Sequence, residues 1–240
     1  MTDEAMRFLL GVLLSGMMLA ANAAPREPAE VAVLAALHRM HAEVPAYPAS
    51  ALEAAILRLQ PDVLCIEVRP DRFAGRAPEA NKIEYPEVVY PLLESRPYRV
   101  YPMEPENPLY DRIGAPYMAA SRAFHEAQPE AAAAFAAYGK AMYAALQAYW
   151  TSPARVNDAV TDQLMRAKHA LQEALVGEGE RAGWEAWNAH FLQVITRAAE
   201  ENPGKRIVVV VGAEHGYWLR ERLAQAPGIR LLDTAALLSE

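Results

Sequence analysis

Hydrophobic residues gather in short continuous runs near both ends of the chain, and amphipathic stretches separate these runs. Residues 206–213 read RIVVVVGA, and four further runs share this character: 31–37, 62–68, 98–104 and 229–233. Continuous apolar runs of this length are typical of parallel strands that are covered on both faces. Residues 49–60 and 217–225 instead carry apolar side chains at helical spacing. The alternation predicts an α/β fold, with a mostly parallel sheet flanked by helices.

The middle of the chain has a different pattern, which is helical throughout. Residues 128–150 are rich in alanine and have apolar side chains on one helical face. A second helix is predicted from Ser152 and Pro153, which suit the cap and the first helical position, and a third from about 180 to 201. We therefore expect a single α/β domain over residues 24–240, with a helical insertion at about 107–201 between the third and fourth strands.

The first residues have the pattern of an export signal. An apolar stretch from Phe8 to about Ala21 is followed by Ala21-Asn22-Ala23, a small-x-small cleavage pattern, which predicts a signal peptide over residues 1–23. As a helix the stretch would span roughly 21 Å, less than the ~30 Å hydrocarbon core of a bilayer. We expect a periplasmic or secreted protein without a stable membrane span after signal cleavage. Translation could start at Met1 or at Met6, which precedes a basic residue.

Charge limits the classes of partner. The formal net charge is -7, and no cluster of lysine or arginine is available to neutralise a phosphate backbone. The sequence therefore predicts no nucleic-acid partner and favours a small-molecule or peptide substrate. It leaves the oligomeric state open.

Ionisable residues follow each of the first four predicted strands. Because the carboxyl ends of parallel strands meet at one edge of a sheet, these side chains are expected to share that edge. In chain order they are His38 and His41, then Glu67 and Arg69, then Glu104, then Glu214 and His215.

Two kinds of chemistry suit this set. A histidine and a glutamate can act as general base and acid, since their surroundings can bring either pKa toward neutrality. Histidines and a carboxylate can equally hold a divalent metal ion with an open position for water, and the candidate ligands are then His38, His41, Glu67 and His215.

Three further residues have structural or functional interpretations. Glu67 lies in an apolar run and needs a partner if it is buried, either Arg69 or a backbone amide. Asn188 lies at the margin of an apolar helix face, where its amide would either join helix to sheet or contact a ligand. Glu214 could be an ordinary acid at a helix N-terminus.

The order of these segments resembles the erythromycin-esterase/ChaN-like superfamily, and within it the TraB/Tiki (GumN-related) families. The matching segments are a strand leading to His38, PDVLCIEVRP with Glu67, WNAHF with Asn188, and VVVVGAEH with His215. They cover roughly residues 31–105 and 180–233. The first motif departs from the family pattern, because residues 35–38 read AALH and lack the glycine that begins GAEH at 212–215.

The resemblance implies an α/β fold in which His38, Glu67 and His215 converge with Asn188 nearby. It also implies one of three activities: metal-dependent proteolysis, as in Tiki members; metal-free activation of water by histidine and glutamate, as in erythromycin esterases; or haem binding, as in ChaN-like members.

We therefore predict an exported hydrolase, possibly dependent on a divalent metal ion, that activates water for ester or peptide hydrolysis. Glu67 and His215 are the predicted catalytic residues, with His38 assisting. Predicted substrate contacts are Asn188, Arg69 and Glu104. The alternative is a periplasmic protein of the same fold that binds haem or a metal ion without turnover.

Overall fold

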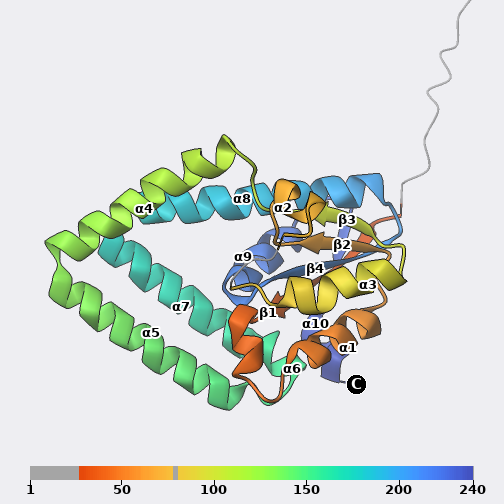
Figure 1. The fold of residues 1–240 in the computed structure, drawn as a ribbon, viewed down its shortest axis with the longest axis horizontal. Coiled ribbons are helices and arrows are strands. Elements are labelled where there is room, and N and C mark those ends of the chain that lie inside the picture. The colour runs from red at the N-terminus through yellow and green to blue at the C-terminus, as the bar shows by residue number, and fades with distance from the viewer. Residues whose placement is uncertain (1–26, 78–80, 240) are drawn as a thin grey trace, which may run out of the picture.

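A computed structural model describes residues 27–77 and 81–239, and the predicted signal peptide at 1–23 lies outside this part of the chain (Figure 1). One five-stranded sheet, with all neighbours parallel, has the strand order β3-β2-β4-β1-β5. The strands are β1 (Ala29–Ala36), β2 (Val63–Ile66), β3 (Arg99–Pro102), β4 (Arg206–Gly212) and β5 (Ile229–Leu231). Each of the five apolar runs contains one strand or most of one, so the predicted α/β class is confirmed.

Strand β4 is the centre of the hydrophobic core. It pairs with β1 from Glu30 opposite Arg206 to Ala36 opposite Gly212, and with β2 on its other side. Residues 207–211 are fully buried. A strand covered on both faces has no solvent side, which explains why its sequence shows no polar alternation.

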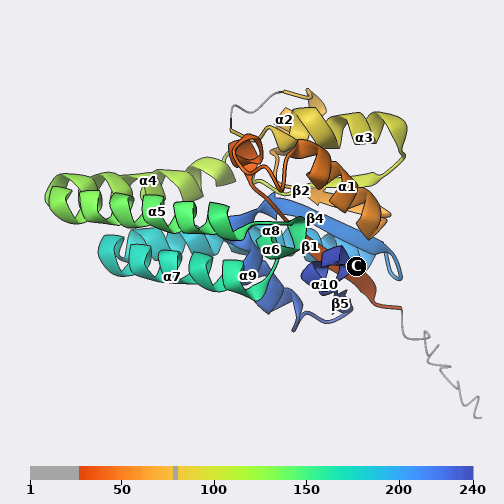
Figure 2. The ribbon, with the colours of Figure 1, turned by 90° about the horizontal axis from the view of Figure 1, so that it is seen from below.

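Helices cover both faces of the sheet (Figure 2). One face carries α1 (Ala49–Leu59) and α3 (Tyr90–Ser95), and the other carries α8 (Glu178–Glu201) and α9 (Ala213–Leu223). The chain after β1 therefore enters one layer, whereas the chain after the neighbouring β4 enters the other. In open α/β sheets such a change of direction creates a crevice at the carboxyl ends of the strands.

Short elements complete the sheet region. They are the 3-10 turn η1 (His38–Ala42), α2 (Pro70–Ala74), the π-helical turn η2 (Tyr85–Val89) and α10 (Thr234–Ser239). Among the described residues, no helix is long and apolar enough to cross a membrane.

The segment between β3 and β4 is the helical insertion. Its helices are α4 (Leu109–Ala127), α5 (Pro129–Tyr149), α6 (Pro153–Val156), α7 (Ala159–Val176) and α8. The long helices extend together to one side of the sheet (Figure 1). Ser152 caps α6 by accepting a hydrogen bond from the Arg155 amide, as its sequence position predicts. The hydrophobic pattern did not define α4, because Phe124 is its only buried residue.

Candidate functional site

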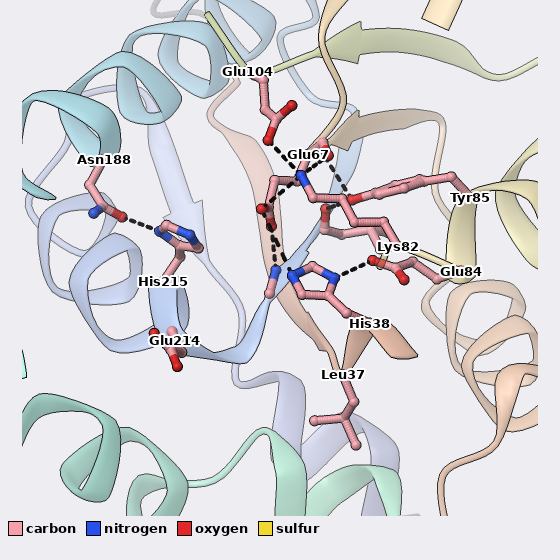
Figure 3. A network of polar contacts seen from close by, with 12 residues as sticks. Leu37, His38, Glu67, Lys82, Glu84, Tyr85, Glu104, Asn188, Glu214 and His215 are labelled. Atoms are coloured by element: carbon pink, nitrogen blue, oxygen red, sulfur yellow. Dashed lines mark hydrogen bonds and ion pairs between the residues drawn. The ribbon is translucent and has the colours of Figure 1, made fainter. Parts of the chain in front are cut away.

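Three predicted site residues come together at the carboxyl ends of the strands (Figure 3). His38 follows β1, Glu67 follows β2, and His215 lies in the first turn of α9 after β4. The Nε2 atom of His38 is 3.9 Å from Oε1 of Glu67. His215 is close enough to help lower the pKa of Glu67, and it lines the same cavity as Glu67.

Glu67 is held as an ionised carboxylate. Its side chain is buried, with the residue 4% exposed. Oε2 accepts a hydrogen bond of 2.6 Å from the Gly212 amide, and Oε1 lies 3.1 Å from the Lys82 ammonium. Burial alone would raise the pKa of Glu67, but Lys82, His38 and His215 oppose it and lower the pKa to about 2. The site therefore contains a fixed negative charge at neutral pH.

Lys82 is the cationic partner of Glu67. Its Nζ donates to the Glu67 carbonyl at 2.9 Å and to Oε1 of Glu104 at 2.5 Å. Glu104 thus lies next to Glu67 and lines the same cavity, and its contact with a substrate stays a prediction. Arg69 is not the partner of Glu67, because its guanidinium binds Asp71 at 3.0 and 2.8 Å.

His38 is oriented by a second carboxylate. Its Nδ1 lies 2.6 Å from Oε1 of Glu84, so Nδ1–H donates to that carboxylate and Nε2 faces Glu67. Burial lowers the pKa of His38, but Glu67 and Glu84 raise it more, and the net shift is upward. The backbone of His38 has φ 52°, in the left-handed region that residues other than glycine rarely adopt. Such strain is concentrated at functional sites, where the surroundings hold the residue in place.

The missing glycine of the first motif has a structural explanation. Ala35 is a regular, buried strand residue whose amide donates to Oδ1 of Asn157 at 2.8 Å. The chain turns only after the strand ends, at His38. No glycine is needed at residue 35, whereas Gly212 ends its own strand.

His215 is held in one tautomer. Its Nδ1 is 2.8 Å from Oδ1 of Asn188, and Nδ2 of Asn188 donates to the Trp184 carbonyl at 2.8 Å. The amide oxygen therefore accepts, so Nδ1 of His215 carries the hydrogen and Nε2 has the lone pair. Burial lowers the pKa of His215 to about 4, although Glu67 and Glu214 act against this. The ring is neutral and stacks on Trp184, with ring centroids 4.7 Å apart.

His41 is not part of the site. It is 2% exposed, Nε2 accepts a hydrogen bond from the Leu37 amide at 2.9 Å, and Nδ1 lies 2.8 Å from the Tyr47 carbonyl. Both ring nitrogens are therefore used by the backbone, and the prediction of His41 as a metal ligand is wrong.

Glu214 lines a smaller cavity together with His38 and His215, and it is more than an acid at a helix N-terminus. Its carboxylate bonds the Tyr143 hydroxyl, receives Lys168 at 2.7 Å and lies 3.2 Å from Nε2 of His169. Burial raises the pKa of Glu214. His169 and Lys168 lower this pKa by a larger amount, so the net pKa is well below the ordinary value.

The arrangement of possible metal ligands bears on the predicted metal site. Within residues 27–77 and 81–239, no set of three or more histidine, cysteine, aspartate or glutamate side chains is arranged to hold one. The Lys82 ammonium also lies between the carboxylates of Glu67 and Glu104, where a cation would bind. Metal and haem binding stay predictions.

A cavity of about 520 Å³ opens beside the site. Glu67, Lys82, Glu104 and His215 form its polar part. Its other walls are mainly apolar and come from α4 and α8, including Tyr110, Trp184 and Trp187. Arg69 lies over Tyr110, 4.9 Å from the ring centre, and so borders this wall. An apolar cavity with a few convergent polar groups is the usual form of a small-molecule site.

Sequence reasoning missed the residues between β2 and β3. Lys82, Glu84 and Tyr85 all contact the site, and the Tyr85 hydroxyl accepts a hydrogen bond from the Glu67 amide at 2.9 Å. Charged and apolar residues are mixed in NKIEYPEVV, residues 81–89, without a helical or strand period. Only one feature of the sequence could have indicated Lys82: a buried Glu67 needs a cationic partner.

Comparisons with protein-family models, with curated proteins and with solved structures found no match. The resemblance to the TraB/Tiki families stays a prediction, and the arguments below depend on the geometry of the site.

The close approach of His38 and Glu67 depends on Gly212. A Cβ atom at this position would lie 2.6 Å from Nε2 of His38 and 3.3 Å from Oε2 of Glu67. We expect Gly212→Ala to displace the His38 ring and to lower the free energy of unfolding by about 1–3 kcal/mol, as overpacking does. Urea unfolding and the NMR resonances of the His38 ring measure the two effects.

Gly139→Ala, on α5, is the matched control, because a Cβ atom added there would meet no neighbouring atom of the described residues within 4 Å. It should leave the His38 resonances unchanged and stabilise the helix slightly. Unchanged His38 resonances in Gly212→Ala would contradict the tight packing described above.

Proposed function

We propose that this protein is a hydrolase that activates water for ester or peptide hydrolysis at His38, Glu67 and His215. One observation carries the proposal: two imidazoles have pKa shifts in opposite directions on either side of an ionised carboxylate, beside a cavity. Paired titratable groups with pKa values pushed apart are typical of acid–base catalysis.

His38 is the proposed general base. Through Nε2 it takes a proton from water as the water oxygen attacks the substrate carbonyl carbon, and it then returns the proton to the leaving group. Glu84 accepts the hydrogen bond from Nδ1–H, which orients the ring and stabilises the imidazolium that forms.

His215 and the charged residues have other roles. With its low pKa, His215 stays neutral, and its Nε2 lone pair accepts a hydrogen bond that orients the attacking water. Glu67 is too weak a base to take the proton, and its fixed charge instead supports the raised pKa of His38. The positive charge of Lys82 stabilises the oxyanion as negative charge develops on it.

We also propose a periplasmic or secreted location and a small-molecule or peptide substrate. The signal-like residues 1–23 and the mainly apolar cavity support these two statements.

A pH profile tests the proposal. With a panel of model esters and peptides, kcat/KM should rise with pH through the pKa of His38, because the base must be neutral. Glu84→Gln should move the midpoint of this rise to lower pH, since Glu84 raises the pKa of His38. Glu87→Gln, at an exposed position on η2, is the control and should keep the wild-type midpoint. No turnover of any ester or peptide, or a midpoint unaffected by Glu84→Gln, would count against the proposal.

A further inference from the structure

Two cavities meet at the proposed hydrolytic site, and His215 lines both of them. The larger cavity, of about 520 Å³, also has Glu67 and Lys82 in its lining. The smaller cavity, of about 220 Å³, has His38 and Gly212 instead. The groups of the proposed function are therefore divided between the two cavities.

This division assigns the two parts of an ester, and the assignment rests on the proposed function. In that function Lys82 stabilises the oxyanion, so the carbonyl group and its acyl chain belong to the larger cavity. His38 returns the proton to the leaving group, so the alcohol belongs to the smaller cavity. Oε1 of Glu67 is 3.1 Å from Nζ of Lys82 and 3.9 Å from Nε2 of His38, so the ammonium and the imidazole are near enough to act on one ester group (Figure 3).

The walls of the larger cavity suit an uncharged, apolar chain. Tyr110 and Trp187 pack edge to face in its lining, with ring centroids 5.5 Å apart. Met118 continues this apolar surface to the exterior, where it is 52% exposed. Carboxylates outnumber ammonium groups in the lining: Glu67, Glu104 and Asp111 against Lys82. An acyl chain that carries a negative charge is therefore disfavoured in this cavity.

Gly114 leaves one wall of the larger cavity without a side chain. It lies on α4, four residues after Tyr110, and so on the same side of the helix. A Cβ atom at residue 114 would meet no neighbouring atom of the described residues within 4 Å. Gly183 on α8 differs, because a Cβ atom there would lie 2.7 Å from the Tyr117 ring, so that glycine is needed for helix packing. A larger side chain at residue 114 would instead reduce the volume of the cavity.

The smaller cavity suits a short alcohol. Its volume is about 220 Å³, against about 520 Å³ for the larger one. Its acid, Glu214, already bonds the Lys168 ammonium at 2.7 Å and the Tyr143 hydroxyl. The apolar part of its lining consists of Ala36, Leu37, Met40, Met165 and Ala213. A leaving group in this cavity therefore contacts mainly small and apolar walls.

We propose that the substrates are esters of an uncharged, apolar acid with a small alcohol, and that Gly114 sets the length of the acyl chain. Water attacks the carbonyl carbon, and the bond from that carbon to the alcohol oxygen breaks. His38 transfers one proton of the water to the alcohol oxygen, and the carboxylic acid product releases the other proton to solvent. The carboxylate that remains is an anion in a cavity rich in carboxylates, which favours its release.

Binding of methyl ketones tests the acyl cavity without hydrolysis, because a ketone has no leaving group. In an NMR titration of the full chain, 2-butanone, 2-hexanone and 2-octanone should shift the Trp187 indole resonance, with affinity rising about 2- to 4-fold for each added methylene. The Trp150 indole donates to Thr161 at 2.9 Å, does not line either cavity, and is the internal control. The 7-oxooctanoate ion, which ends in a carboxylate, should bind at least about 10-fold more weakly than 2-octanone.

Gly114→Leu tests the residue that sets the chain length. It should weaken binding of 2-octanone about 10-fold and leave 2-butanone within about twofold, because the longer chain loses the space that leucine fills. The midpoint of urea unfolding should not fall, since leucine forms helix better than glycine. Gly139→Leu is the matched control on α5, outside both linings, and should keep wild-type affinity for all three ketones. If Gly114→Leu does not fold, Gly114→Ala should weaken 2-octanone about 2- to 4-fold.

Two isomeric esters test which part of the substrate occupies which cavity. Methyl octanoate carries its long chain on the acyl side, and heptyl acetate carries it on the alcohol side. The value of kcat/KM should be at least about 10-fold higher for methyl octanoate. An equal or higher value for heptyl acetate would overturn the proposal. So would ketone affinity that does not rise with chain length, or that Gly114→Leu leaves unchanged. Length-dependent ketone binding without hydrolysis of any ester would reject the proposed hydrolase function but support the larger cavity as the site of an apolar chain.

Discussion

Replacing His38 with asparagine is expected to lower kcat by about 10²–10⁴-fold, the usual contribution of a general base. Asparagine keeps a polar side chain but cannot accept a proton at neutral pH. KM should change less than kcat, because a general base stabilises the transition state more than the bound substrate. Steady-state hydrolysis of the best ester or peptide measures both constants.

His125→Asn is the control for this prediction. His125 lies in the last turn of α4, is exposed, and has Nδ1 2.8 Å from the Ser121 carbonyl, away from the site. It should keep wild-type kcat. A His38→Asn variant that also kept wild-type kcat would exclude His38 as the base.

The same histidine gives the folded protein a defined pH dependence. The pKa of His38 is raised above its ordinary value of 6.5, so the folded chain holds this proton more tightly than the unfolded chain. Its contribution to stability is therefore complete below pH 6.5 and is lost as pH rises through the folded pKa. His38→Asn should remove this contribution, which makes stability curves a check that does not depend on a substrate.

The sheet and part of the site could be predicted from sequence for one physical reason. Strands buried on both faces need continuous apolar residues, as residues 207–211 show, and parallel strands bring their carboxyl ends to one edge. These two facts place His38, Glu67 and His215 near one another without any knowledge of side-chain contacts.

Other features depend on contacts that leave no periodic signal. Lys82 and Glu84 come from an irregular segment, and only their neighbours in space reveal their role. His41 lies three residues after His38 and has the same side chain, yet its ring bonds the backbone of Leu37 and Tyr47. Its role could not be separated from that of His38 without the path of the chain after β1.

Lys82→Met is expected to lower the free energy of unfolding by about 3–5 kcal/mol, because it leaves buried carboxylates without their cation. Glu67 and Glu104 are both nearly buried, and Lys82 lies 3.1 and 2.5 Å from them. Methionine keeps most of the apolar length of lysine, so the change removes mainly charge. Urea unfolding at neutral pH measures the loss.

Lys205→Met is the control, because it also replaces a lysine with methionine but at an exposed position. Lys205 is exposed and lies 3.3 Å from Asp62 on the surface, where an ion pair contributes about 1 kcal/mol or less. A Lys82→Met variant that lost no more stability than Lys205→Met would show that the ammonium does not compensate the buried carboxylates.

Measurements at acid pH test whether Lys82→Met loses stability because of charge or because of packing. The folded pKa of Glu67 is about 2 and its ordinary value is 4.5, so its ionisation stabilises the protein above pH 4.5, and this stabilisation is lost as pH falls through the folded pKa. Without Lys82 the pKa of Glu67 rises, and protonation of the carboxyl removes the uncompensated charge. The difference in unfolding free energy between wild type and Lys82→Met should therefore narrow as pH falls from 4.5 toward 2. If this difference in unfolding free energy stayed constant over that range, lost packing would explain the lower stability, because packing does not depend on the protonation of Glu67.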